Sequence, residues 1–139
     1  MKLPYASVEY AGDDFFVAVT PSGHAQAIDI RGERSAAAGP TELLYLALGS
    51  CTGADVISVL QKKLQKVTGY RIEIRGERRE EYPRSFRKME LKHIIRGRGV
   101  SAEAVAKAVE LSTDKYCGVA ATLRPTAEIV SSFEIIEDA

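Results

Sequence analysis

The first thirty residues alternate short apolar runs with sequences typical of tight turns. Residues 7–30 read SVEYAGDDFFVAVTPSGHAQAIDI, in which Gly12-Asp13-Asp14 and Pro21-Ser22-Gly23 separate three such runs. Both triplets have the composition and spacing of hairpin turns. The segment is therefore predicted to form a meander of three strands, followed by a loop over residues 31–39.

A long helix is predicted to open at Pro40-Thr41-Glu42 and to include the cationic sequence QKKLQK, residues 61–66, in its last turns. Pro40 suits the first position of a helix, and the carboxylate of Glu42 suits the positive end of the helix dipole. Apolar residues cover nearly every face of this segment: Leu43, Leu44, Leu46, Ala47, Leu48, Ala54, Val56, Ile57, Val59 and Leu60. A helix that is apolar all round is buried rather than lying on a surface. Gly69, after the cationic turn QKKLQK, is the expected stop signal.

The second half of the chain predicts two long strands, a helix and a last strand. Apolar residues alternate with charged ones on either side of a connection at residues 80–83, which predicts an antiparallel strand pair with charged outer faces. Ser101 is a natural N-cap for the following helix. Residues 114–125 are expected to form a turn or a short helix, and residues 126–137 the last strand.

The predicted order of elements is βββ-α-ββ-α-β. Strands and helices do not alternate as in a parallel α/β fold, so the class is α+β, a mainly antiparallel sheet with a long buried central helix. The whole chain, residues 1–139, is expected to form a single domain. A helix without a polar face needs more cover than one sheet supplies in so short a chain. A homodimer is the simplest source of that cover.

The charge balance and the N-terminal sequence limit the classes of partner. Lys+Arg and Asp+Glu both count 19, and this balance argues against non-specific nucleic-acid binding and against a polybasic membrane contact. The N-terminus has no apolar segment of a signal peptide, and no uninterrupted apolar run reaches about 18 residues, so no transmembrane helix is expected. The expected localisation is cytoplasmic, where cysteines more often have redox, catalytic or metal roles than structural ones.

Cys51 lies in the middle of the long helix, with Gly49 and Gly53 two residues to either side. Each glycine costs a helix roughly 1 kcal/mol relative to alanine, so something is expected to approach closely here. The pattern leaves two interpretations open, a functional thiol or glycines that let another helix pack tightly. Cys117 precedes Gly118, and by pattern alone it is more often a small buried apolar residue.

No metal and no cofactor is expected. A zinc site would need both cysteines together with His24 and His93, and these four residues do not stand at ligand spacing. Both histidines are expected to be ordinary surface residues. The sequence lacks GxGxxG, GxxxxGK[ST], HExxH and CxxC motifs. The charges of the strand pair alternate in sign, which fits a solvated face rather than an RNA-binding surface.

Two segments carry a resemblance to a known family. Residues 39–63 read GPTELLYLALGSCTGADVISVLQKK and contain Cys51, and residues 111–123 read LSTDKYCGVAATL and contain Cys117. They resemble the two cysteine signatures of the OsmC/Ohr family (osmotically inducible protein C / organic hydroperoxide resistance). The details Gly-Pro-x-Glu-Leu-Leu and Cys-Thr-Gly-x-Asp-Val are more similar to the broad OsmC-like branch, including YhfA-like proteins, than to Ohr proper. The resemblance implies an OsmC-like fold and a homodimer with two active sites at its interface.

The resemblance also implies a function. Family members reduce organic hydroperoxides: the first cysteine, here Cys51, becomes a sulfenic acid, and the second, here Cys117, condenses with it to a disulfide that a dithiol reduces. The implied partners are therefore a second copy of the chain, an organic hydroperoxide and a dithiol reductant. One alternative is a non-enzymatic dimer that binds an apolar small molecule or senses oxidants. In another alternative, both cysteines are packing residues of a structural dimer.

Two positions depart from the peroxidase pattern of the family. The resemblance places a glutamate ten residues before the first cysteine, paired with an arginine that stabilises the thiolate. Thr41 occupies that position here, and the glutamate is Glu42, which is rotated by about 100° on a helix. Residues 1–30 contain no arginine, so the nearest candidates are Arg31 and Arg34, and slower peroxidase turnover is expected. The expected catalytic residues are Cys51, Cys117, Glu42 and Arg34.

Overall fold

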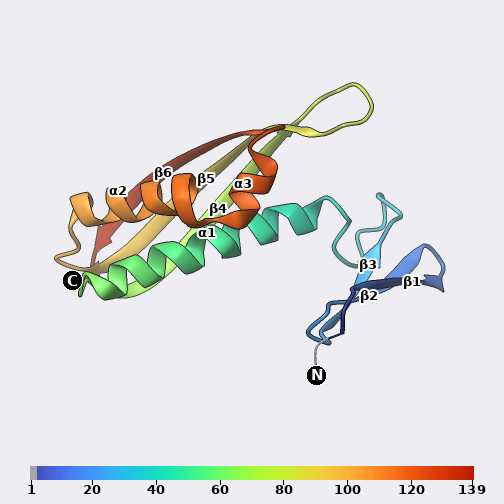
Figure 1. Ribbon diagram of the computed structural model, residues 1–139, viewed down its shortest axis with the longest axis horizontal. Coiled ribbons are helices and arrows are strands. Elements are labelled where there is room, and N and C mark those ends of the chain that lie inside the picture. Colours follow the sequence, from blue (N-terminus) through green and yellow to red (C-terminus); the bar gives the residue numbers. More distant parts are fainter. Residues whose placement is uncertain (1–2) are drawn as a thin grey trace. The chain divides into compact units, whose positions relative to one another are not determined.

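The computed structural model describes residues 3–139, which divide into two compact units. Unit 1 is Met1–Leu44 and unit 2 is Tyr45–Ala139. The elements are β1 (Ser7–Gly12), β2 (Phe15–Val19), β3 (Ala25–Asp29), α1 (Glu42–Lys62), β4 (Lys66–Arg78), β5 (Phe86–Arg98), α2 (Ala102–Leu111), the π-helical turn η1 (Ser112–Tyr116), α3 (Gly118–Leu123) and β6 (Glu128–Glu137) (Figure 1).

The observed class and the order of elements confirm the α+β prediction. The segment expected to form a turn or a short helix contains both η1 and α3. The helix α1 ends at Lys62, and Gly69 lies inside β4, so the expected stop at Gly69 was wrong. Leu64 has a φ of 57° just beyond the helix, a left-handed conformation that helices commonly adopt where they end. The single-domain expectation for residues 1–139 stays a prediction.

Unit 1 contains a three-stranded antiparallel sheet with the order β1-β2-β3. Its turns form where they were predicted: Gly12, Asp13 and Asp14 all have positive φ between β1 and β2, and Gly23 has a φ of 89° between β2 and β3. Tyr10 and Ile28 both stand opposite Phe16 in the register. Among residues 3–44, Ile28 and Asp29 are the two buried ones, so this sheet has almost no core of its own.

Unit 2 contains a second sheet with the order β4-β5-β6. The strands β4 and β5 are antiparallel, whereas β5 and β6 are parallel because α2, η1 and α3 carry the chain back between them. Buried residues of β5 alternate with exposed ones such as Glu90 and Lys92, so one face of the sheet packs on helices and the other faces solvent. Leu48 of α1 packs with Met89 of β5 on the covered face.

The two glycines beside Cys51 face strand β4 rather than another helix. A Cβ atom built on Gly49 would lie 2.7 Å from Cδ1 of Ile74, and one built on Gly53 would lie 2.7 Å from Cδ1 of Ile72. The sequence therefore indicated a close approach correctly, but its partner is a pair of isoleucine side chains. These glycines let the middle of α1 sit directly on the sheet, which fixes the depth at which Cys51 is held.

The helix α1 is buried along one face in the single chain. Its buried residues are Leu48, Gly49, Thr52, Gly53, Val56 and Leu60, while Leu46 is 61% exposed. Among the described residues, α1 is the one helix long and apolar enough to cross a membrane by length and composition, which the sequence had not led us to expect. A core helix passes the same test, and the packing of α1 on β4 and β5 is of that kind.

Candidate thiol site

Two cysteine thiols that are distant in the sequence meet in unit 2. Cys51 is half-buried on α1, and Cys117 is 2% exposed between η1 and α3. Their sulfur atoms and a carboxylate oxygen of Asp55 all lie within 4.8 Å of one another. Nothing local in the sequence forces this meeting, so the packing of the α2-η1-α3 segment against α1 creates it.

Backbone hydrogen bonds hold Cys117 in place. Its own N–H donates to the carbonyl oxygen of Ser112 at 2.8 Å, across the π-helical turn. The N–H of Ala120 donates to Sγ of Cys117 at 3.3 Å, so the thiol acts as the N-cap of α3. Both ends of this residue are therefore fixed, and the sulfur has a defined position facing α1.

Asp55 is a site residue that the sequence analysis missed. It follows Cys51 by four residues on α1, and this spacing puts both side chains on the same helix face. The Ser112 hydroxyl donates to Oδ2 of Asp55 at 3.0 Å and lies 3.1 Å from the carbonyl oxygen of Thr52. The signal was present in the spacing Cys-Thr-Gly-x-Asp, but only the fold shows that Cys117 joins the same face.

Burial separates the chemistry of Cys117 from that of an ordinary thiol. Removal from water, and then the neighbouring Cys51 thiol, raise the pKa of Cys117 to about 11. The N–H groups of Ala120 and Val119 oppose this rise. Cys117 is therefore a protonated thiol near neutral pH and a poor first nucleophile.

His93 is buried in the core of unit 2, so the expectation of an ordinary surface residue was wrong. The ring is 0% exposed, and its Nδ1 lies 2.6 Å from the Tyr70 hydroxyl. Position 93 lies on the covered face of β5 together with Leu91 and Ile95, which the charged neighbours in the sequence concealed. His24 is exposed, as expected. The group that could ligate a metal beside the thiols contains Asp55 and no histidine among the described residues.

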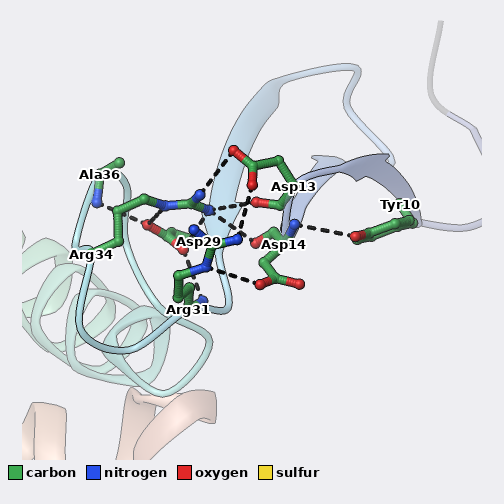
Figure 2. A network of polar contacts seen from close by, with 7 residues as sticks. All are labelled: Tyr10, Asp13, Asp14, Asp29, Arg31, Arg34 and Ala36. Carbon is green, nitrogen blue, oxygen red and sulfur yellow. Dashed lines mark hydrogen bonds and ion pairs between the residues drawn. The ribbon is translucent and has the colours of Figure 1, made fainter.

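The two candidate arginines are bound to carboxylates in unit 1 (Figure 2). Arg34 makes a two-pronged contact with Asp29, at 2.9 Å through Nε and 3.0 Å through Nη2, and also contacts Asp13 at 3.1 Å. Arg31 contacts Asp13 at 2.9 Å and Asp14 at 3.0 Å. The guanidinium of Arg34 holds the pKa of buried Asp29 far below its usual range. Both arginines thus organise the loop that follows β3.

Glu42 begins α1 and is bound to the preceding loop. Its Oε1 accepts a hydrogen bond of 2.8 Å from the N–H of Gly39, three residues earlier. This bond satisfies a donor near the start of the helix, which is the capping role that its position predicts. Glu42 and Arg34 belong to unit 1, whereas the two thiols belong to unit 2. Their catalytic roles stay predictions.

An open groove of about 630 Å³ runs along α1 beside the site in unit 2. Its lining residues are Asp55, Ser58, Val59, Lys62, Lys63, Leu111 and Tyr116. Asp55 lines the groove and also lies within 4.8 Å of both sulfur atoms, and Tyr116 directly precedes Cys117. Small molecules therefore have a path from solvent to the carboxylate, with an apolar wall and two lysines along it.

The fold and the site together define a class: an α+β protein in which a core helix and a short capped helix hold two adjacent thiols. Comparison with known proteins identifies the family within this class. The family model described as OsmC-like protein matches residues 32–132. Protein YhfA of Escherichia coli (strain K12) is 37% identical over 131 residues, which cover 94% of this chain and 97% of that protein. The chain belongs to the OsmC-like family.

Solved structures share this fold. An OsmC-like protein from Mycoplasma pneumoniae matches with a TM-score of 0.82 at 17% identity, over 98% of this chain and 99% of that one. An organic hydroperoxide resistance protein OsmC from Legionella pneumophila matches with a TM-score of 0.70 at 14% identity, over 93% and 94% of the two chains. At these identities the likeness concerns the fold alone. The family recognised from the cysteine signatures is confirmed.

Proposed function

We propose that this protein is a thiol-dependent peroxidase that reduces organic hydroperoxides through Cys51 and Cys117. The observation that carries the proposal is the meeting of the two sulfur atoms within 4.8 Å in a family linked to peroxide resistance and redox chemistry. A second thiol this close protects a sulfenic acid from further oxidation. We assign the attacking role to the more accessible Cys51 and the resolving role to buried Cys117.

The proposed reaction has three steps. The Cys51 thiolate attacks a peroxide oxygen, an S–O bond forms as the O–O bond breaks, and the released alkoxide takes up a proton to leave as an alcohol. The Cys117 thiol then attacks the Cys51 sulfenic acid, an S–S bond forms, and water leaves. An S–S bond is about 2.05 Å long, so the sulfur atoms must approach from their present separation by side-chain rotation. A dithiol donor supplies two electrons and restores both thiols.

The proposed working form is a cytoplasmic homodimer. Unit 1 buries almost nothing among its described residues, and a three-stranded sheet needs a packed face for stability. Val8 is 61% and Tyr10 is 57% exposed on one face of that sheet. Leu46 adds an exposed apolar side chain on α1. A second copy of the chain is the cover that we propose for these surfaces.

A non-enzymatic role as an oxidant sensor is the second candidate, and one observation favours it. Arg31 and Arg34 are already engaged by three carboxylates in unit 1, so their positive charge is largely neutralised. A thiol with weak cationic support is a slow reductant of hydroperoxides, and an oxidant sensor needs only one oxidation per signal rather than rapid turnover. A multiple-turnover assay with cumene hydroperoxide and a dihydrolipoyl donor separates the two, since only the enzyme consumes many equivalents.

The first prediction concerns the fate of each thiol. One equivalent of cumene hydroperoxide should remove both free thiols of the reduced protein together and join them in one disulfide. Cys117→Ser, which keeps an oxygen to cap α3, should accumulate a sulfenic acid on Cys51 and, with excess hydroperoxide, should proceed to sulfinic acid. Cys51→Ala should react at least about tenfold more slowly, because burial keeps Cys117 protonated. Peptide mass mapping after alkylation reads all three results.

The same experiment can reject the assignment of roles. Oxidation of Cys117 alone, with Cys51 still reduced, would show that the roles are reversed. Two thiols that both persist in excess hydroperoxide would leave them as packing residues. Circular dichroism of each variant must match that of the parent protein, so that a loss of reaction is not a loss of fold.

A further inference from the structure

We propose that the reduced protein binds a thiophilic divalent cation such as Zn²⁺ through Cys51, Cys117 and Asp55. This inference goes beyond the peroxidase proposal, because the cation needs only that the two thiols are reduced. The three ligand atoms already lie within 4.8 Å of one another. Two soft thiolates with one carboxylate form a donor set that suits zinc better than magnesium or calcium.

The positions of the ligand atoms fit a tetrahedral ion after a small adjustment. Zinc lies about 2.3 Å from a thiolate sulfur and about 2.1 Å from a carboxylate oxygen. Ligands at these distances stand roughly 3.6–3.8 Å apart around a tetrahedron. Contraction of the present cluster by about 1 Å, which side-chain rotation can supply, would therefore complete three sides of a site.

Rigid elements position the three ligands. Cys51 and Asp55 stand four residues apart on α1, which is the spacing of the two histidines in helical HExxH zinc sites. Cys117 is fixed by the hydrogen bonds that cap α3 and close η1. The buried Ser112 hydroxyl donates to Oδ2 of Asp55 and so orients this carboxylate, as outer hydrogen bonds do in many metal sites.

The fourth coordination position would face solvent. Asp55 lines the groove along α1, so a water molecule or a small anion can reach a cation held there. Three protein ligands with one open position are typical of catalytic zinc sites, whereas structural sites have four protein ligands. The cation would take the place of the thiol protons, and its charge would offset the repulsion among two thiolates and a carboxylate this close together.

Metal binding and disulfide formation exclude each other, because both use the same two sulfur atoms. An organic hydroperoxide that oxidises the loaded site would take two electrons from the two thiolates and two protons from the buffer in solution. The products are one disulfide, one alcohol, one water molecule and the free divalent cation. The bound cation therefore protects the thiols, and oxidation releases it.

Cobalt is the probe that tests the site, because thiolate ligands give Co²⁺ intense charge-transfer absorption and a tetrahedral site gives it strong visible bands. Reduced protein under anaerobic conditions should bind one Co²⁺ per chain with both signals, and Zn²⁺ should displace it. Asp55→Asn should weaken the cobalt affinity at least about tenfold. Asp114→Asn, which changes an exposed carboxylate on η1, is the matched control and should bind as the parent does.

Other outcomes overturn the inference. Charge-transfer absorption that is absent at a large excess of Co²⁺ rejects a thiolate site. An affinity unchanged by Asp55→Asn rejects the third ligand, and binding that survives Cys117→Ser with both signals intact rejects the paired thiols. Hydroperoxide consumption is measured separately in the presence of a chelator. Cobalt binding without turnover would defeat the proposed function alone, and turnover without cobalt binding would defeat this inference alone.

Discussion

The imidazole of His93 is closed off from solvent, with the Tyr70 hydroxyl at Nδ1 and no described hydrogen-bond partner at Nε2. Burial lowers the pKa of His93 from 6.5 to about 4, because the charged form would lose its hydration. The unfolded chain therefore takes up this proton near pH 6.5, while the folded chain takes it up only near pH 4. The contribution of His93 to the free energy of unfolding consequently depends on pH between about 4 and 6.5.

The second prediction follows from this difference. The contribution of His93 to the free energy of unfolding should be flat above about pH 7.5 and should fall as the pH is lowered towards 4, by about 3 kcal/mol in total. His93→Asn keeps a polar atom near Tyr70 but cannot be protonated, so it should flatten the dependence between pH 7 and 5. Urea unfolding at pH 7.5, 6.0 and 5.0 measures the effect.

The carboxylate of Asp29 also titrates, but below the range of pH 7 to 5 in which the effect of His93 is measured. Arg34 lowers the pKa of Asp29, so the contribution of that carboxylate to stability is present above its unfolded value of 3.8 and lost only below it. A slope between pH 7 and 5 that is equal in His93→Asn and the parent would show that another group causes it.

At the scale of elements, the pairing of β4 with β5 leaves no room for a side chain at Gly97. A Cβ atom there would lie 2.2 Å from the carbonyl oxygen of Lys66 and 2.6 Å from Cγ2 of Val100. The nearest contact is backbone of the partner strand, which cannot rotate away. The small residue therefore permits β5 to pass close to the start of β4.

The third prediction uses this contact. Gly97→Ala should lower the free energy of unfolding by about 2–3 kcal/mol, because the strands must separate to admit the methyl group. Gly32→Ala is the control, since a Cβ at Gly32 has no described neighbour within 4 Å. Chemical denaturation of both variants checks the difference. Equal stabilities for the two would show that the β4–β5 register adapts without cost.

Individual elements also show which parts of the fold could be predicted from the sequence. The strands, their turns and the N-cap at Ser101 follow local rules, and Ser101 does accept the N–H of Ala104 at 3.2 Å. The parallel pairing of β5 with β6 joins strands separated by three helical elements, and no local pattern encodes it. Asp55 and the burial of His93 were missed for the same reason, since each depends on what packs against one face.

The candidate site was predictable where a motif marks it. The cysteine signatures identified Cys51 and Cys117, whose proximity the structure shows. Arg34 and Glu42 were chosen by their position in the sequence, and in unit 1 their polar groups bind Asp29 and the N–H of Gly39. A motif specifies which residue types are present, but the partners of a flexible charged side chain depend on all the polar groups within its reach.

At the scale of the whole molecule, the fourth prediction is that the protein is a homodimer in solution. Light scattering at micromolar concentration should give twice the mass of one chain, which is 15.2 kDa. Leu46→Asp introduces a charge on an exposed part of α1 and should lower the dimer fraction, because a buried unpaired charge is very costly at an interface. Lys107→Asp, on an exposed part of α2, is the control and should leave the mass unchanged.

A monomer mass for the parent protein would contradict this prediction. It would also leave the exposed apolar side chains of unit 1 to be covered in some other way. Leu48→Asp serves as a second reference, because Leu48 is 0% exposed within unit 2 and its replacement should unfold the chain rather than separate two copies.

Because β5 is the central strand of its sheet, it should also be the last strand to lose its hydrogen bonds when the sheet opens. Its backbone N–H groups face β4 on one side and β6 on the other, so they can exchange with deuterium only when a neighbouring strand detaches. The amides of the outer strands β4 and β6 have one such neighbour within unit 2. Deuterium should therefore enter β5 last, and its slowest amides report the global unfolding of the sheet that supports the thiol site.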